Sequence, residues 1–216
     1  MIESKHNPKV RLIRSLRVRA NERREMGPFL AEGIRLVEEA NAANWPIRFV
    51  LYTESLNERG GLLVDSLLKR GVECVTVSNS AMKSLSETES PQGVLAVLEA
   101  IQIPLPKTLD FVLIPDRVRD PGNLGTLLRT AAAASVQAVF IPPETAEAFA
   151  PKVVRSGMGA HFRLPIYALT WEEIEQRTRD LQVFEADMAG KSCWETELRL
   201  PLALVIGGEE IGRAHV

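Results

Sequence analysis

The feature that most constrains the fold is the alternation of short apolar segments with helix-forming segments along most of the 216 residues. In the N-terminal half, the apolar runs have the length of strands. The last run does not alternate apolar with polar residues, as expected when both faces of a strand are covered. We expect strands at 29–32, 47–52, 72–77 and 93–98, and helices at 34–43, 61–70 and 79–85. This order predicts a small α/β sandwich.

The C-terminal half repeats the alternation with different spacing. We expect strands at 111–114, 138–141, 183–186 and 202–206, and helices at 124–134, 151–158 and 171–181. Strands that alternate with helices favour a parallel sheet with helices on both faces. Between the halves, residues 101–108 hold two prolines, which suit an extended linker. The chain is therefore expected to have domains at 1–100 and 109–216.

The N-terminal segment is basic. Residues 1–28 contain eight Lys/Arg and three Glu, a local charge of +5 in a chain whose net charge is −2. Asn7 and Pro8 suit a helix start, because the Asn side chain can cap and Pro fits the first turn. The basic residues on one arc of this helix are Arg11, Arg14 and Arg17. This arc is either a solvated helix face or an electrostatic footprint for a phosphate backbone.

Capping residues indicate where two of the expected helices begin or end. Asn79 is expected to cap the helix that ends near Leu85, and Gly71 is expected to end the helix before it. The two cysteines, Cys74 and Cys193, are expected to be reduced and structural, because no Cys-x-x-Cys motif is present. No Cys/His cluster with metal-ligand spacing occurs either, so no metal is expected.

The composition suits a globular protein, with 45% apolar and 25% charged residues. No apolar run approaches the roughly 20 residues that a membrane-spanning helix needs. The first residues also lack the apolar core of a signal peptide. These features predict a cytoplasmic protein with no membrane partner.

The most informative stretch is 116–131, which leaves an apolar strand, turns at Pro121 and enters an Ala-rich helix. Asn123 is expected to cap that helix. One interpretation is purely structural: a capped helix packs on a sheet and directs Arg129 to solvent. The other is functional, because open α/β sheets bind ligands at the carboxyl ends of their strands.

The run Asn-Leu-Gly-x-x-x-Arg-Thr-Ala at 123–131, after Asp-Pro-Gly, resembles the first motif of the SpoU/TrmH RNA methyltransferases, a branch of the knotted SPOUT superfamily. Residues 151–166 are similar to the second motif of that family, and 204–212 resemble the start of the third. The order and spacing of the three segments agree with the family. The resemblance implies a SPOUT-type parallel-sheet domain.

The N-terminal half resembles the substrate-binding domain that many members of this family carry, which is related in fold to ribosomal protein L30. The matching fragments are 7–9, 29–33 and 85–94. By this resemblance, Arg11, Arg14 and Arg17 are expected to contact structured RNA, most reasonably ribosomal RNA. Arg155, in the second motif, is a further RNA-binding candidate, although it also suits a helix surface.

The resemblance implies S-adenosylmethionine as methyl donor, a ribose 2′-hydroxyl as acceptor and a homodimer. Arg129 lies at the position of the family's essential arginine, either as a base or as a phosphate clamp that orients the hydroxyl. The clamp is favoured, because a guanidinium pKa above about 12 makes deprotonation costly. Asn123 and Glu209 are the other catalytic candidates. The cofactor is expected at the glycines of the third motif: Gly207, Gly208 and Gly212.

Family members continue beyond the third motif with a strand and a helix that threads the knot, whereas this sequence ends at Val216. The trefoil knot is therefore expected to be incomplete in this chain. Two interpretations follow. The chain is either a shortened form of an RNA methyltransferase, or a non-catalytic protein that binds RNA through its N-terminal domain.

Overall fold

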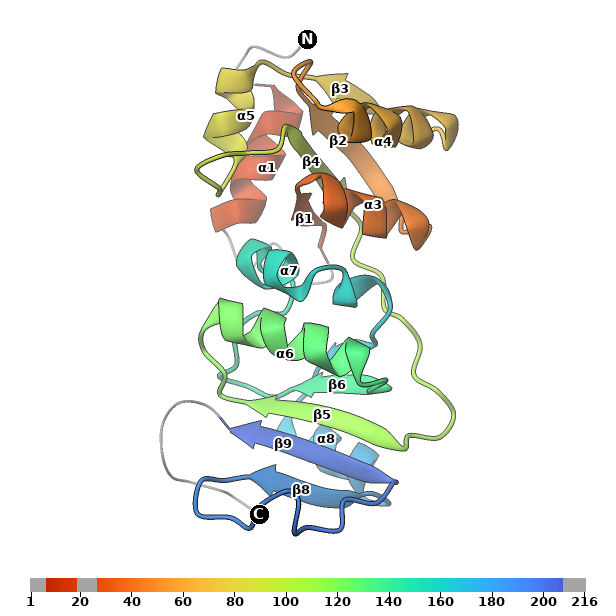
Figure 1. Ribbon diagram of the computed structural model, residues 1–216, viewed down its shortest axis with the longest axis vertical. Helices are drawn as coiled ribbons and strands as arrows, with labels where there is room; N and C mark the ends of the chain where they lie inside the picture. Colours follow the sequence, from red (N-terminus) through yellow and green to blue (C-terminus); the bar gives the residue numbers. More distant parts are fainter. Residues whose placement is uncertain (1–6, 19–26, 208–216) are drawn as a thin grey trace. The chain divides into compact units, whose positions relative to one another are not determined.

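The computed structural model describes residues 7–18 and 27–207. These residues divide into two compact units (Figure 1). The first unit comprises Met1–Ile101 together with Phe149–Phe162, and the second comprises Gln102–Ala148 and Arg163–Val216. A short stretch from the second half of the sequence therefore packs in the first unit.

The first unit is built on a mixed four-stranded sheet of order β1-β4-β2-β3. Strand β4 is antiparallel to both of its neighbours, and β2 pairs with β3 in parallel. In chain order, the elements are α1 (Pro8–Val18), β1 (Phe29–Glu32), α3 (Ile34–Ala42), β2 (Ile47–Tyr52), α4 (Glu58–Lys69), β3 (Cys74–Thr76), α5 (Asn79–Leu85), β4 (Val94–Leu98), α7 (Pro151–Gly157) and the short 3₁₀ helix η1 (Ala160–Phe162).

Helices cover both faces of this sheet (Figure 1). On one face, α1 and α5 pack on side chains of β1, β2 and β4 in a core that includes Ile13, Leu16 and Met82. On the other face lie α3 and α4, whose buried residues include Val37 and Leu67. All five residues of β4 are buried, as the lack of alternation in that strand predicts. The α/β sandwich expected from the sequence is confirmed.

In the first unit, the expected start of α4 and the expected cap of α5 are wrong, and capping explains both. Helix α4 begins at Glu58 rather than Gly61, because the Asn57 side chain accepts a hydrogen bond of 2.9 Å from the Gly60 N–H. Helix α5 is capped by Ser78, whose hydroxyl accepts from the Ala81 N–H, and Asn79 is its first helical residue. The start of α4 lies three residues earlier than expected, whereas α5 starts at Asn79 as expected and is capped by the residue before it.

The segment 149–162 forms part of the aromatic core of the first unit. Phe149 lies 5.0 Å from Phe29 between ring centroids, and Phe162 lies 5.3 Å from Trp45. Helix α7 also packs on β1. The sequence places α7 among the helices that cover the parallel sheet, and this expectation is wrong. Burial of Phe162 and Val153 in the first unit is the physical reason.

The second unit contains a parallel sheet of order β7-β6-β5-β9-β8. Its elements are β5 (Phe111–Asp116), α6 (Pro121–Ala133), β6 (Ala138–Ile141), β7 (Ile166–Ala168), α8 (Trp171–Thr178), β8 (Gln182–Ala186) and β9 (Leu202–Gly207). Helices α6 and α8 lie on opposite faces of the sheet (Figure 1). The parallel sheet is confirmed, whereas the three-residue β7 has no counterpart among the expected strands.

Both cysteines are unpaired. Burial, followed by the nearby Glu73 carboxylate, raises the pKa of the half-buried Cys74 thiol. Cys193 is exposed, which does not support the packing role expected for it. Within residues 7–18 and 27–207, no helix is long and apolar enough to cross a membrane.

Candidate active site

The centre of the parallel sheet brings two of the resembling motifs together. Strands β5 and β9 are neighbours, and their register pairs Asp116 with Gly207 at the carboxyl ends of both strands. From β5 the chain proceeds to β6 and β7 on one side, and later returns to β8 and β9 on the other. The carboxyl ends of β5 and β9 therefore form a topological switch point, where parallel α/β sheets bind ligands.

The loop after β5 has an unusual backbone. Arg117 adopts a φ of 49°, which non-glycine residues rarely do. Its guanidinium lies 3.2 Å from the Asp116 carboxylate, whose side chain is 15% exposed. Such strain is common where a functional site fixes the chain. Sequence reasoning did not nominate Asp116 or Arg117, although a charged pair directly after a buried strand is the signal for them.

Helix α6 leaves this loop, and its cap differs from the one expected. Asp120 is the N-cap and accepts a hydrogen bond of 2.9 Å from the Asn123 N–H. Asn123 is therefore in the first turn and is not the capping residue. Pro121 at the first helical position fits, because its missing N–H would lack a helical partner. The Asn123 side chain is on the exposed side of the helix.

Arg129 lies further along α6 and is exposed. Arg129 follows Asn123 by six positions, which corresponds to about 9 Å along a helix axis. Thr126, also exposed, lies between them. The opposite side of the helix is buried through Leu124 and Leu128, which holds α6 on the sheet. Packing thus fixes the side of the helix on which Asn123 and Arg129 lie.

Gly207 ends β9 and is exposed. A Cβ built at this position would meet no atom within 4 Å. Protein packing in the described residues therefore does not require a glycine here, and a ligand has room to approach the backbone. The other candidates of the third motif, Gly208, Glu209 and Gly212, lie outside the described residues. Within the described part of the chain, no group of three or more His, Cys, Asp or Glu is arranged to hold a metal ion.

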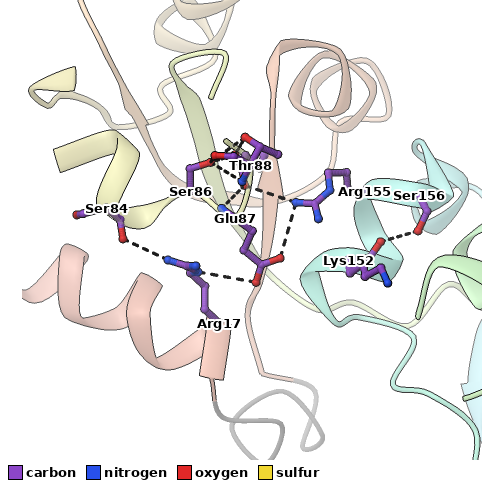
Figure 2. Close-up of polar contacts among 9 residues, drawn as sticks. Arg17, Ser84, Ser86, Glu87, Thr88, Lys152, Arg155 and Ser156 are labelled. Carbon is purple, nitrogen blue, oxygen red and sulfur yellow. Dashed lines mark hydrogen bonds and ion pairs between the residues drawn. The ribbon is translucent and has the colours of Figure 1, made fainter. Parts of the chain in front are cut away.

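Two of the RNA-binding candidates contact carboxylates of the protein itself (Figure 2). Glu87 lies between Arg17 of α1, at 3.8 Å, and Arg155 of α7, at 3.7 Å. Arg155 also lies 3.8 Å from Glu32. Arg17 additionally donates a hydrogen bond of 3.2 Å to the Ser84 carbonyl oxygen. These contacts give both arginines a structural role in the first unit.

The Glu32 carboxylate is the most enclosed group of this cluster, with 12% of its side chain exposed. It accepts hydrogen bonds from the Ser86 hydroxyl, the Thr88 hydroxyl at 2.8 Å and the Glu87 N–H at 3.2 Å. The other two RNA-binding candidates differ in setting, since Arg11 is exposed and Arg14 is half-buried on α1. The structure brings Arg17 and Arg155 together at Glu87, and RNA binding by all four arginines stays a prediction.

Comparisons with known proteins relate the two halves to two families. Residues 7–96 match the MRM3-like substrate binding domain. Residues 110–215 match the SpoU rRNA Methylase family. The chain is 34% identical over 214 residues to the 23S rRNA (guanosine(2553)-2'-O)-methyltransferase RlmP of Bacillus subtilis, covering 98% of this chain and 83% of that protein.

Solved structures agree with these matches. An rRNA methyltransferase from Sinorhizobium meliloti has a TM-score of 0.84 and 29% identity, covering 99% of this chain and 83% of that chain. The AdoMet-bound rRNA methyltransferase from the same organism has a TM-score of 0.82 and 28% identity, covering 99% of this chain and 82% of that chain. The chain belongs to the SpoU rRNA methylase family and carries an MRM3-like substrate-binding domain before the methylase segment.

Proposed function

We propose that this protein transfers a methyl group from S-adenosylmethionine to a ribose 2′-hydroxyl of ribosomal RNA. The observation that carries the proposal is the meeting of the first and third family motifs at the carboxyl ends of β5 and β9. The relatives support it, since one is named a 23S rRNA 2'-O-methyltransferase and another was solved with AdoMet bound. RNA is the partner that the substrate-binding domain implies. We place the enzyme in the cytoplasm, where the ribosomal RNA of a bacterium such as Bacillus subtilis, the source of one relative, is found.

The residues at the switch point fit the methyl donor. Gly207 offers exposed backbone at the strand end without a side chain in the way, and Gly208 and Gly212 remain candidates by family position. When bound, S-adenosylmethionine supplies a methyl group that its sulfonium already activates. The protein then has to align the acceptor hydroxyl with that methyl and help remove its proton.

Arg129 is proposed as the group that aligns the acceptor. A guanidinium presents several N–H donors in a fixed plane and binds phosphate in a bidentate manner. Clamping the phosphate next to the target ribose would orient the 2′-hydroxyl without deprotonation of the arginine. Asn123, on the exposed side of the same helix, is proposed to hydrogen-bond the substrate, and Glu209 to pair with Arg129 or with a substrate group.

Substitution of Arg129 tests this role. We expect Arg129→Ala to lower kcat/KM by roughly 100-fold or more, since misplacement of a reacting group by about 1 Å has an effect of that size. Arg129→Lys should recover little activity, because a point charge lacks the bidentate geometry. The assay measures transfer of labelled methyl to unmodified ribosomal RNA. Protection of the adjacent phosphodiester from alkaline cleavage identifies the 2′-hydroxyl as the acceptor.

Arg179→Ala is the matched control, because Arg179 is an exposed arginine at the end of α8 that pairs only with the neighbouring Asp180 within the described residues. Activity of Arg129→Ala equal to that of the control would contradict the catalytic role. RNA binding without methyl transfer by the unaltered chain would instead support the alternative, a non-catalytic RNA-binding protein.

We also propose that the protein acts as a homodimer through its C-terminal half. The support is the apolar surface near the edge strand β8, here called the 183–200 surface. Its exposed large apolar side chains are Val183, Met188, Trp194, Leu198 and Leu200. Several large apolar side chains exposed in one segment are typical of a surface that another chain covers.

A further inference from the structure

The first unit contains a cleft that is separate from the cluster of Arg17, Glu87 and Arg155. It has a volume of about 620 Å³ and lies where β2 ends and β4 begins. Its floor includes Thr53, which is 3% exposed, and Met82, which is 1% exposed. Gly93 also lines the cleft with a φ of 80°, and a Cβ there would lie 2.4 Å from the Thr53 hydroxyl oxygen. The floor is therefore closely packed and the cleft has a defined shape.

The charged residues that line this cleft are all basic. Arg35, Arg59 and Lys83 contribute from α3, α4 and α5, and no Asp or Glu is among the lining residues. Arg59 donates to the Glu38 carboxylate at 2.7 Å, which neutralises one of the three charges. Arg35 and Lys83 are exposed and form no ion pair within the described residues. The cleft therefore presents two uncompensated positive charges.

The backbone adds to this positive potential. The first turns of α3 and α4 both border the cleft, and helix N-termini carry partial positive charge. Glu58 in the first turn of α4 offsets part of this effect there. In α3, Gly33 provides no side-chain cap, and the Ile34 N–H instead donates to the Gln92 side chain at 2.9 Å. An anion in the cleft would thus be favoured by both side chains and backbone.

The remaining lining residues are mostly uncharged and polar. Ser55 donates a hydrogen bond of 2.9 Å to the Asn79 side-chain oxygen, which leaves the Asn79 amide NH₂ to donate elsewhere. Asn57 and Gln92 bring further amide groups. Amides next to arginine and lysine are the residue types that contact phosphate, ribose and base edges together.

We propose that this cleft, formed by α3, α4, α5 and the 91–93 loop, binds the phosphodiester backbone of structured RNA through Arg35 and Lys83. The inference rests on the proposed function for the choice of RNA. It assigns the main phosphate contacts of the first unit to the cleft instead of α1. Arg17 on α1 already contacts Glu87 and Ser84, whereas Arg35 and Lys83 face a shaped cavity.

The double substitution Arg35→Ala with Lys83→Ala tests the site. The probe is an unmodified transcript of 23S ribosomal RNA, and binding is measured by filter retention over a series of salt concentrations. We expect affinity to fall about tenfold and the slope of log K against log salt to decrease by about two, one for each lost phosphate contact. Both residues are exposed, so a thermal melt should match that of the unaltered chain.

A control pair and a pair at the rival α1 surface each remove the same charge elsewhere in the first unit. Lys69→Ala with Arg48→Ala changes residues outside the cleft, at the end of α4 and in β2, and Arg11→Ala with Arg14→Ala changes α1. Full affinity in the Lys69 and Arg48 control, with a larger loss in the cleft variant than in the α1 variant, supports the site. Unchanged affinity and slope in the cleft variant overturn it, as does loss confined to the α1 variant.

The methyl-transfer assay separates this inference from the proposed function. A cleft variant that binds and methylates the RNA like the unaltered chain refutes the cleft and leaves the methyltransferase function intact. An unaltered chain that neither binds nor methylates ribosomal RNA refutes both. A raised KM with a nearly unchanged kcat in the cleft variant supports a binding role away from the reacting atoms.

Discussion

At the scale of residues, the same side-chain type takes different roles according to its surroundings. Arg129 is exposed on α6, whereas Arg155 and Arg17 meet at Glu87. A sequence motif gives the spacing of such residues but not their neighbours. Arg155 lies in a family motif, yet its contacts are with carboxylates that are more than 60 residues away in the chain.

Glu32 gives a prediction at this scale. Glu32→Ala would remove the acceptor for the Ser86 and Thr88 hydroxyls and the Glu87 N–H, and one partner of Arg155. We expect a loss of roughly 2–3 kcal/mol in the free energy of unfolding, because several enclosed donors lose their partner. Chemical denaturation measures it. Glu38→Ala, which removes a more exposed carboxylate paired with Arg59, is the control and should cost under about 1 kcal/mol.

At the scale of elements, helices are located by pattern, but their first residue depends on which side chain caps them. Asn57, Ser78 and Asp120 cap α4, α5 and α6, although other residues nearby have similar capping propensity. Which of these residues caps the helix depends on the position and direction in which the preceding loop enters it. Helix α8 is the clearest case, because Thr170 and Glu173 form a reciprocal capping box.

The capping box of α8 predicts a pH-dependent effect. The hydrogen bonds from the Thr170 N–H and hydroxyl lower the pKa of the Glu173 carboxyl. A depressed folded-state pKa means that this contribution to stability is present above the ordinary pKa of glutamate and is lost as the pH falls through the lowered value. Thr170→Ala removes the N-cap hydroxyl, whose loss should destabilise the protein by about 1 kcal/mol at neutral pH. The loss should be somewhat smaller in acid, because the hydroxyl also donates to the Glu173 carboxylate, whereas the N–H of residue 170 still donates to it. Urea denaturation at several pH values measures both.

If Thr170→Ala has the same effect at every pH, the Thr170 hydroxyl does not act through the charge of Glu173. Thr196→Ala is a suitable control, since the hydroxyl of this half-buried threonine bonds a nearby carbonyl oxygen, that of Ser192, and no carboxylate of the described residues. It should change stability by no more than about 0.5 kcal/mol at any pH.

At the scale of the whole molecule, the proposed homodimer makes a prediction. The 183–200 surface exposes Trp194 at 94%, and an aromatic side chain of this kind is a typical interface hot spot. We expect light scattering to give twice the chain mass, and Trp194→Glu to weaken the dimer at least about tenfold. Leu62→Glu, at a leucine of the first unit that is 64% exposed, should leave the mass unchanged. A monomeric mass for the unaltered chain would contradict the proposal.

The sequence by itself determined the element types, because the period of apolar residues depends only on local geometry: every strand of four or more residues and every α helix of the described part lies where the pattern predicts one. The motif at 123–131 likewise identified the family, because it preserves residue types at fixed spacing. Only the tertiary structure decided that α7 belongs to the first unit, that Arg155 contacts Glu32, and that Arg35 and Lys83 share a cleft. Those outcomes depend on packing between segments that are distant in the chain. Burial and charge together determine that packing, and a local sequence pattern does not predict it.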